Sequence, residues 1–173
     1  CVRCQTSLSD LELEYQPQNT KLYFFKYDQS FPITIATTRP ETKLGDSAVA
    51  VSPKDKRYAQ YIGKEYAANF VGKELKIKII ADPMVDIKFG TGTLGVTPAH
   101  SLADQELAQK HKLGSIQVID KYGKINENGG KFSGLKVAEA RAQIVAELEK
   151  SNLIEKTQDI ENNLSVCYRC AKE

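Results

Sequence analysis

The sequence has no long apolar segment and almost no excess of either charge. None of its apolar runs approaches the roughly 20 residues that cross a bilayer, and the amino-terminal Cys-Val-Arg-Cys lacks a signal peptide's apolar stretch. We therefore expect a cytoplasmic chain with no membrane partner. Lys and Arg number 24 against 22 Asp and Glu, a net charge of +2, so any nucleic-acid contact must be local.

The length of 173 residues suits one domain covering residues 1–173. A domain of this size buries roughly 70% of the surface that its unfolded chain exposes, so it needs no disulfides for a core. The chain begins on Cys1 rather than on an initiator methionine. This start favours a fragment of a larger protein.

Strand-like runs dominate the sequence, which predicts a mixed α/β, β-rich fold. The predicted strands cover residues 11–15, 22–27, 33–36, 48–51, 75–80, 85–89 and 116–119. One helix is predicted to begin near Ser101, and an amphipathic helix is predicted over 136–151, where apolar residues recur at helical spacing. The Asn- and Gly-rich segment 126–130 is predicted to be a flexible loop.

The only four cysteines form two CxxC pairs at the ends of the chain, Cys1 with Cys4 and Cys167 with Cys170. Two such pairs complete the closed tetrahedral shell of a structural Zn²⁺ site, which leaves no open position for catalysis. The alternatives are free thiols or a disulfide, but disulfides are rare in the cytosol. We expect residues 1–8 and 165–173 to form a zinc-binding neck that joins the termini.

Two distant polar segments carry the candidate chemistry. The first, Thr37-Thr38-Arg39-Pro40-Glu41-Thr42, follows an apolar run, and its proline stops the strand and opens a short helix. The second runs from Gly90-Thr91-Gly92-Thr93 to Thr97-Pro98-Ala99-His100, with Asp104 four residues later. Its glycines allow a close approach of the backbone, and the following helix start points free amides at the same space. The two segments predict one polar pocket.

These two segments, with Leu44-Gly45-Asp46-Ser47-Ala48-Val49-Ala50-Val51, closely resemble the editing insertion of the valyl-tRNA synthetase family, a class Ia aminoacyl-tRNA synthetase. The resemblance runs from Ser9 to about Leu153. It implies a β-barrel-like editing domain with a few covering helices. The implied function is post-transfer editing, the hydrolysis of Thr-tRNA(Val), because an apolar pocket for valine cannot strongly reject threonine.

The resemblance also implies roles for individual residues. The candidates for catalysis are Thr37, Thr38, His100 and Asp104, with Asp104 as the partner of the substrate ammonium. The candidates for substrate binding are Arg39, Thr42, Phe89, Gly90, Thr97 and Asp104, with Phe89 stacking on adenine. We do not expect His100 to be a general base, because the family mechanism relies on positioned water.

Each of these residues also has a structural alternative. Asp104 fits a capping pattern with Ser101, and Thr42 fits a helix cap. Arg39 could form a surface ion pair, Thr37 and Thr38 could be ordinary strand residues, and Phe89 could be a core residue because it alternates with Val85 and Ile87.

The chain departs from the family at two positions, with Gly95 in place of the usual lysine and Ser101 in place of the usual aspartate. Lys43, where the family usually has an apolar residue, could supply the missing cation, although a solvated lysine is the alternative. These departures leave open a catalytically weakened module that only binds the acceptor end of tRNA. The editing domain of a leucyl or isoleucyl relative is a further alternative.

The expected partners are the 3′ acceptor end of tRNA(Val), a threonine or valine moiety, and the catalytic domain of the parent synthetase. Nothing in the sequence resembles the nucleotide-binding signatures of that catalytic domain. We therefore expect ester hydrolysis but no aminoacylation from this chain, and ATP only for the full-length synthetase.

Overall fold

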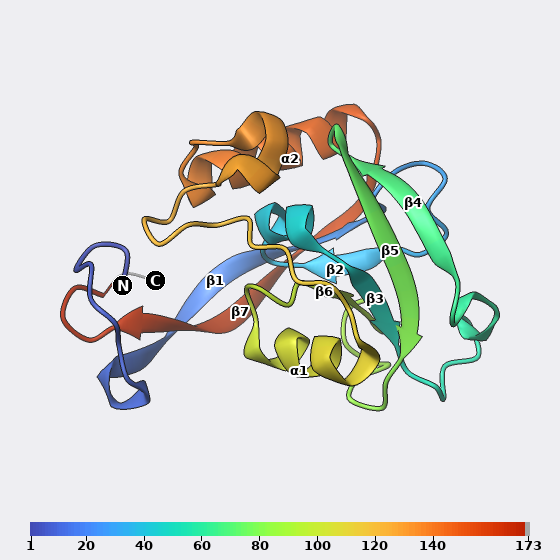
Figure 1. Ribbon diagram of the computed structural model, residues 1–173, viewed down its shortest axis with the longest axis horizontal. Coiled ribbons are helices and arrows are strands. Elements are labelled where there is room, and N and C mark those ends of the chain that lie inside the picture. The colour runs from blue at the N-terminus through green and yellow to red at the C-terminus, as the bar shows by residue number, and fades with distance from the viewer. Residues whose placement is uncertain (172–173) are drawn as a thin grey trace.

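The computed structural model describes residues 1–171, which form two β-sheets and two α-helices joined by short 3₁₀ helices (Figure 1). Residues 172–173 of the predicted neck lie outside the described residues. The 3₁₀ helices are η1 (Asp10–Glu12), η2 (Pro40–Gly45), η3 (Ala59–Tyr61) and η4 (Glu127–Phe132).

The first sheet is a long antiparallel ribbon. Strand β1 (Leu13–Phe25) pairs with β7 (Ile154–Cys167) from Leu13 opposite Cys167 onward, and β2 (Ile35–Thr37) lies on the other side of β1. The two strands predicted at 11–15 and 22–27 are thus parts of one strand. Strand β7 was not predicted, because its first half is polar and exposed, although Ile160, Leu164 and Val166 alternate with exposed residues in its second half.

The second sheet has the strand order β4-β5-β3-β6, formed by β4 (Glu65–Phe70), β5 (Lys73–Ala81), β3 (Ala48–Val51) and β6 (Thr93–Val96). Strands β3 and β5 are parallel, and the other pairs are antiparallel. All four residues of β3 are buried, because Val49 and Val51 face the main core while Ala48 and Ala50 face a second cluster. The predicted strands at 48–51 and 75–80 are confirmed.

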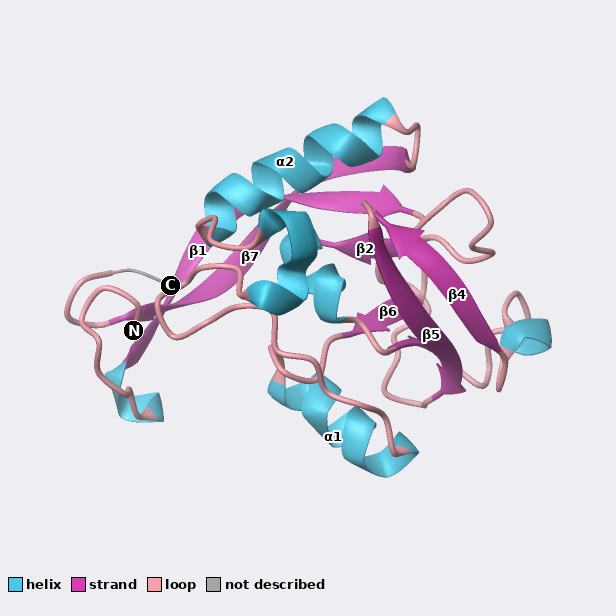
Figure 2. Ribbon diagram, turned by 45° about the horizontal axis from the view of Figure 1, so that its top comes forward, coloured by secondary structure: helices cyan, strands magenta, loops and turns pink. Residues whose placement is uncertain are grey.

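Both predicted helices are confirmed. Helix α2 (Val137–Lys150) buries Ala140, Ile144 and Leu148 in the main core, as its periodicity predicts. Helix α1 (Leu102–His111) begins after Ser101 and packs Leu107 against the second cluster. The two helices lie on opposite sides of the molecule, with α2 along the ribbon (Figure 2).

The predicted barrel is not closed. Among residues 1–171 the strands form two separate sheets, and no backbone ladder joins β2 to β6. The two sheets do meet there, because the Thr93 hydroxyl donates a hydrogen bond to the Thr34 carbonyl oxygen at 3.1 Å. The fold is therefore a β-rich mixed α/β fold rather than a β-barrel.

The strand predicted at 33–36 is present as β2, although it covers Ile35–Thr37. Three other local predictions need correction. Residues 85–89 form turns instead of a strand, and residues 116–119 contribute only an isolated bridge at Ile119. The predicted flexible loop at 126–130 lies largely in η4, where Gly129 is buried. A Cβ atom at Gly129 would lie 1.9 Å from the Ile125 side chain, so glycine serves close packing there.

Candidate functional site

The first polar segment forms a rigid corner at the end of β2. The Thr37 hydroxyl oxygen accepts a hydrogen bond from the Arg39 N–H at 3.1 Å, and the Thr42 hydroxyl donates to the Arg39 carbonyl oxygen at 2.9 Å. Pro40 occupies the first turn of η2, where its missing N–H costs nothing. Three side chains of the segment are thus fixed before any ligand binds.

Glu41 ties this corner to helix α2. Its carboxylate is fully buried and accepts two hydrogen bonds from the Arg141 guanidinium, at 2.8 and 2.9 Å. The Arg39 Nε also lies 3.5 Å from Glu41 Oε1. The ion pair predicted for Arg39 is therefore present, and its acidic partner is buried. This arrangement fixes η2, and with it Thr42, against α2.

The second polar segment continues from β6 into α1. The His100 N–H donates to the Thr97 carbonyl oxygen at 3.0 Å, which closes the turn, and Ser101 caps the helix by accepting from the Asp104 N–H at 3.3 Å. Asp104 is buried, and its Oδ2 accepts from the Thr97 N–H at 2.8 Å. The Asp104 backbone thus takes part in the predicted cap, while its carboxylate reaches back to Thr97.

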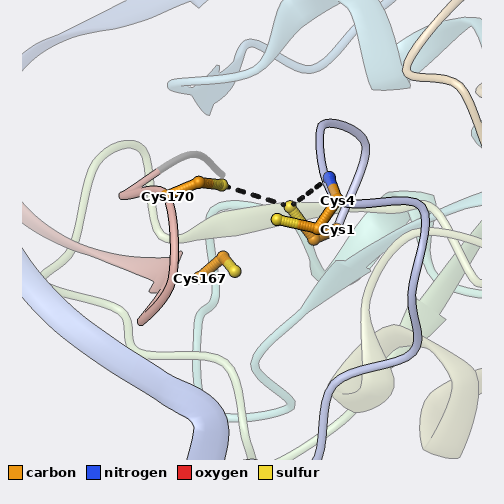
Figure 3. A group of neighbouring side chains, drawn as sticks. All are labelled: Cys1, Cys4, Cys167 and Cys170. Atoms are coloured by element: carbon orange, nitrogen blue, oxygen red, sulfur yellow. Dashed lines mark hydrogen bonds between the residues drawn. The ribbon is translucent and has the colours of Figure 1, made fainter.

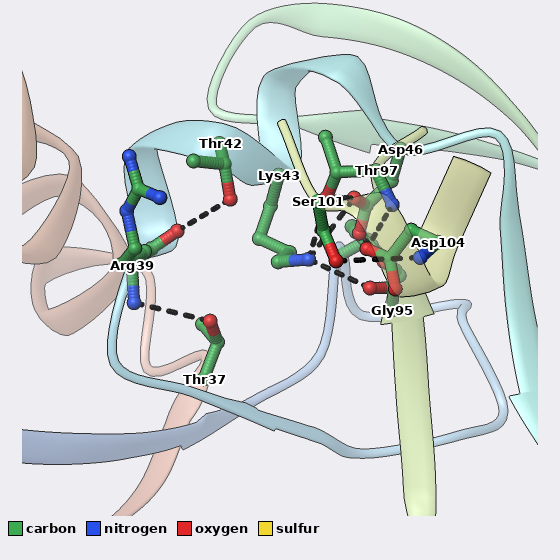
Figure 4. Close-up of polar contacts among 10 residues, drawn as sticks. Thr37, Arg39, Thr42, Lys43, Asp46, Gly95, Thr97, Ser101 and Asp104 are labelled. Atoms are coloured by element: carbon green, nitrogen blue, oxygen red, sulfur yellow. Dashed lines mark hydrogen bonds and ion pairs between the residues drawn. The ribbon is translucent and has the colours of Figure 1, made fainter. Parts of the chain in front are cut away.

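Lys43 and Asp46 form a buried ion pair between the two segments (Figure 4). The Lys43 ammonium lies 3.1 Å from Asp46 Oδ1, 2.8 Å from the Gly95 carbonyl oxygen and 2.7 Å from the Thr97 hydroxyl oxygen. Asp46 also accepts hydrogen bonds from the Thr97 and Tyr27 hydroxyls. Lys43 is 5% exposed, so the alternative of a solvated lysine is wrong.

The same network explains the glycine at position 95. A Cβ atom there would lie 2.6 Å from Asp46 Oδ2, 3.0 Å from the Tyr27 hydroxyl oxygen and 3.3 Å from Lys43 Cδ. No larger side chain fits unless the buried pair moves. Burial raises the pKa of Asp46, although the charge of Lys43 and the hydroxyl donors oppose that shift.

The two segments enclose a small hollow of about 180 Å³. It is lined by Thr37, Thr38, Arg39, Thr42, Lys43, Leu94, Gly95, Thr97, His100, Ser101 and Asp104. The structure therefore brings together seven of the nine predicted pocket residues. Its volume suits an aminoacyl group and is too small to enclose a nucleoside as well.

Phe89 and Gly90 do not line this hollow. Phe89 is 58% exposed, so the alternative of a core phenylalanine is wrong. Gly90 has a φ of +57°, and a Cβ atom there would lie 2.8 Å from Ala36 Cβ. The turn that carries both residues thus packs against β2 next to Thr37.

His100 is committed to a structural contact. Its Nε2 accepts a hydrogen bond from the Val118 N–H at 3.0 Å. Burial lowers the pKa of His100, and the positive charges of Arg39 and Lys43 lower it further. The ring is therefore neutral near pH 7, and its acceptor nitrogen is already occupied.

The four cysteines form a cluster at the open end of the ribbon (Figure 3). Their sulfur atoms all lie within 4.8 Å of one another, and those of Cys1 and Cys170 are 3.5 Å apart. A tetrahedral site with metal–sulfur bonds of about 2.3 Å places its sulfur atoms roughly 3.8 Å apart, so the cluster fits a metal after small shifts. The two CxxC pairs, 163 residues apart in sequence, can thus hold one metal ion.

Several residues that build the site carried no signal in the sequence. Asp46 contacts the pocket residues Lys43 and Thr97, Tyr27 donates a hydrogen bond to Asp46, and Arg141 holds Glu41 behind the pocket. Asp46 lies only three residues after Lys43, but nothing in its sequence neighbourhood shows that Thr97 also converges on it. Such contacts follow from tertiary structure alone.

Comparison with solved structures shows where the same fold occurs. The fold matches part of LeuRS from Agrobacterium radiobacter K84, solved in a ternary LeuRS–tRNA–LeuAMS complex, with a TM-score of 0.50 and 16% identity over 86% of this chain and 20% of that one. No protein-family model matches the chain. The chain therefore shares its fold with a segment of an aminoacyl-tRNA synthetase.

Relatives with much higher sequence identity show the family of the chain. The chain is 48% identical to valine–tRNA ligase of Thermotoga maritima and 47% identical to that of Petrotoga mobilis, in each case over 98% of this chain and 20% of the relative. It is also 48% identical to valine–tRNA ligase of Wolinella succinogenes over 95% of this chain and 18% of that protein. The chain belongs to the valyl-tRNA synthetase family, and it spans about a fifth of the length of these relatives.

Proposed function

We propose that the chain is an editing domain that hydrolyses threonine from mischarged Thr-tRNA(Val) and so supports the fidelity of translation. The observation that carries this proposal is the hollow of about 180 Å³, where a buried carboxylate and four threonine side chains meet. The catalytic domain of the parent synthetase and the 3′ acceptor end of tRNA(Val) are the proposed partners, with the cytoplasm as the location. No helix of residues 1–171 has the length and apolar character to cross a bilayer.

The hydrogen bonds within the pocket show which groups remain for a substrate. The three N–H donors of Lys43 already have three acceptors, and the Thr97 hydroxyl donates to Asp46. Thr42 uses its proton on the Arg39 carbonyl oxygen and can still accept, while Thr37 accepts from the Arg39 N–H and can still donate. Within residues 1–171, the Thr38 hydroxyl has no hydrogen-bond partner that would prevent either role.

These assignments give the proposed mechanism. Asp104 binds the substrate ammonium, because only its Oδ2 is engaged by another described residue, the Thr97 N–H. Thr42 accepts from the substrate hydroxyl, which a valine lacks. Thr37 and Thr38 hold the attacking water or the oxygen that develops negative charge, and positioning together with these donors provides the catalysis. His100 keeps the turn in place and is not the proton acceptor.

Lys43 supplies the cation of the pocket wall in this proposal. It holds Thr97 by the hydroxyl, and the Thr97 N–H holds Asp104. Lys43 thus acts as a positioning residue rather than a contact of the substrate. The exposed ring of Phe89 is proposed to stack on the adenine outside the hollow, and Gly90 lets its turn approach β2.

We further propose that Zn²⁺ is the metal of the cysteine cluster, held by Cys1, Cys4, Cys167 and Cys170. Four thiolates leave no coordination position for water, so the ion stabilises the neck and takes no part in hydrolysis. ATP belongs to the aminoacylation reaction of the full-length synthetase.

Single-turnover deacylation of Thr-tRNA(Val) and Val-tRNA(Val), with the chain in excess, tests this function. We expect selective loss of threonine by the wild type and a large loss of rate for Asp104→Asn, which removes the charge but keeps the shape. Asp159→Asn, an exposed change on β7, is the control and should retain full activity. Binding of tRNA without turnover by the wild type would instead identify a docking module, and preference for another misacylated tRNA would identify a leucyl or isoleucyl relative.

A further inference from the structure

A second hollow adjoins the pocket. It has a volume of about 240 Å³ and shares two wall residues with the pocket, Thr38 and Arg39. Strands β1 and β7 and helix α2 provide the rest of its lining. The Arg39 side chain extends away from Lys43 and Asp46 (Figure 4). Arg39 therefore lies between the pocket and the second hollow.

The lining of the second hollow is positively charged. It includes Lys21, Arg39 and Arg141 but no acidic residue. Glu41 pairs with both arginines, yet its side chain is fully buried, whereas those of Arg39 and Arg141 are 44% and 32% exposed. Three cationic side chains therefore line one space whose lining contains no acidic residue, in a chain whose total net charge is only +2.

The uncharged part of the lining is polar as well. Gln18, Asn19 and Asn162 contribute side-chain amides, and Thr38 contributes a hydroxyl. Amide N–H groups and guanidinium groups both donate hydrogen bonds to phosphate oxygens. The hollow thus combines positive charge with hydrogen-bond donors, which is the chemistry of a phosphate site.

We propose that the second hollow binds a phosphodiester group of the nucleic-acid strand whose terminal ribose carries the ester. This inference rests on the proposed function, because an ester in the pocket leaves the 5′ phosphate of the same nucleotide one sugar away. A strand that crosses Arg39 would then place its phosphate among the three cations. Such a local site reconciles nucleic-acid binding with the almost balanced charge of the whole chain.

Two ester substrates test this site. One is 3′-threonyl adenosine, which has no phosphate, and the other is a short RNA that ends in CCA and carries the same ester. Lys21→Gln removes an exposed cation of the second hollow, and Lys76→Gln removes an exposed lysine of β5 outside it. Arg141→Lys keeps a positive charge beside Glu41 but loses the planar guanidinium.

We expect Lys21→Gln to lower kcat/KM for the RNA ester about three- to tenfold at low salt and to make its salt dependence shallower by about one unit of log–log slope. Hydrolysis of threonyl adenosine should not change, and Lys76→Gln should match the wild type on both substrates. Arg141→Lys should weaken the RNA ester more than the nucleoside ester.

Equal losses on both substrates, or no loss on either, would overturn the phosphate site. If the wild type hydrolyses neither substrate, the proposed function fails and the phosphate site is judged by binding alone. In that case, equilibrium binding of the uncharged CCA RNA should still weaken in Lys21→Gln and not in Lys76→Gln. Unchanged binding in both variants would reject it.

Discussion

At the scale of single residues, Gly95 has no room for a side chain beside the buried ion pair. Gly95→Ala places a methyl group 2.6 Å from Asp46 Oδ2, so we expect a loss of about 1–3 kcal/mol in the free energy of unfolding. Gly114→Ala is the matched control, because a Cβ atom at Gly114 would meet nothing within 4 Å. Urea unfolding of both variants measures the difference, and equal midpoints would contradict the crowding at position 95.

The buried pair of Lys43 and Asp46 gives a second prediction at this scale. Lys43→Met leaves the Asp46 carboxylate buried without its cation, which should cost about 3–5 kcal/mol in the free energy of unfolding. Adding Asp46→Asn should restore part of that loss, because no unpaired charge then remains. If Lys43 positions Thr97 and Asp104, the rate of deacylation should fall most in Lys43→Met and recover in part in the double variant.

Lys73→Met is the control for that experiment. The Lys73 ammonium also donates to a backbone carbonyl oxygen, that of Leu44 at 2.7 Å, but it lies outside the pocket. A moderate loss of stability without a selective loss of deacylation is expected. No recovery in the double variant would show that charge pairing is not the role of Lys43.

At the scale of elements, Asp82 links the loop after β5 to the last turn of α1. Burial acts to raise the pKa of Asp82, but hydrogen bonds from Lys110 and His111, at 2.6 and 3.1 Å, outweigh it and bring the pKa to about 2. Since an unfolded aspartate has a pKa of about 3.9, this stabilisation is present above that pH and is lost as the pH falls toward 2.

We therefore expect Asp82→Asn to remove about 1–2 kcal/mol from the free energy of unfolding near pH 6, a figure reduced because Lys110 is more than half exposed. The difference between wild type and variant should shrink between pH 4 and pH 2. Chemical denaturation across this range measures it, with Asp159→Asn as the exposed control. A difference that stays constant with pH would contradict the ion pair.

Elements with local signals could be predicted from the sequence. The apolar spacing of α2, the alternation of β5 and the cap at Ser101 each depend on residues within a few positions, and all three are confirmed. Strand β7 was missed, because its first half is exposed and polar and pairs with β1 through the backbone, while the short apolar alternation at Ile160, Leu164 and Val166 is interrupted by Asn162.

The pocket shows the same division between local and distant information. The two polar segments predicted most of the residues that line it, because each segment has turn and cap signals of its own. The contact of Lys43 with Gly95 and the anchor of Glu41 at Arg141 join residues that are 52 and 100 positions apart. No spacing rule in one sequence reveals such contacts.

At the scale of the whole molecule, the cysteine cluster controls the end of the ribbon. Removal of the proposed Zn²⁺ by a chelator should increase amide exchange in residues 1–8 and 165–171, because the ion would no longer hold the two ends together around the hydrogen bond from the Tyr168 N–H to the Glu12 carbonyl oxygen. The pocket should keep its protection. Hydrogen-exchange mass spectrometry checks this, with zinc-saturated chelator as the control, and unchanged exchange at the neck would argue against a metal there.

The pairing of β1 with β7 also has a kinetic consequence. Leu13 lies opposite Cys167, so this contact closes a loop that includes nearly the whole chain, whereas β3, β5 and β6 pair over far shorter separations. Contacts between residues that are far apart in sequence cost loop-closure entropy before their own pairing energy is gained. The second sheet should therefore form early in folding. The pairing of β1 with β7 should form last, after the rest of the chain has folded and brought these two strands together.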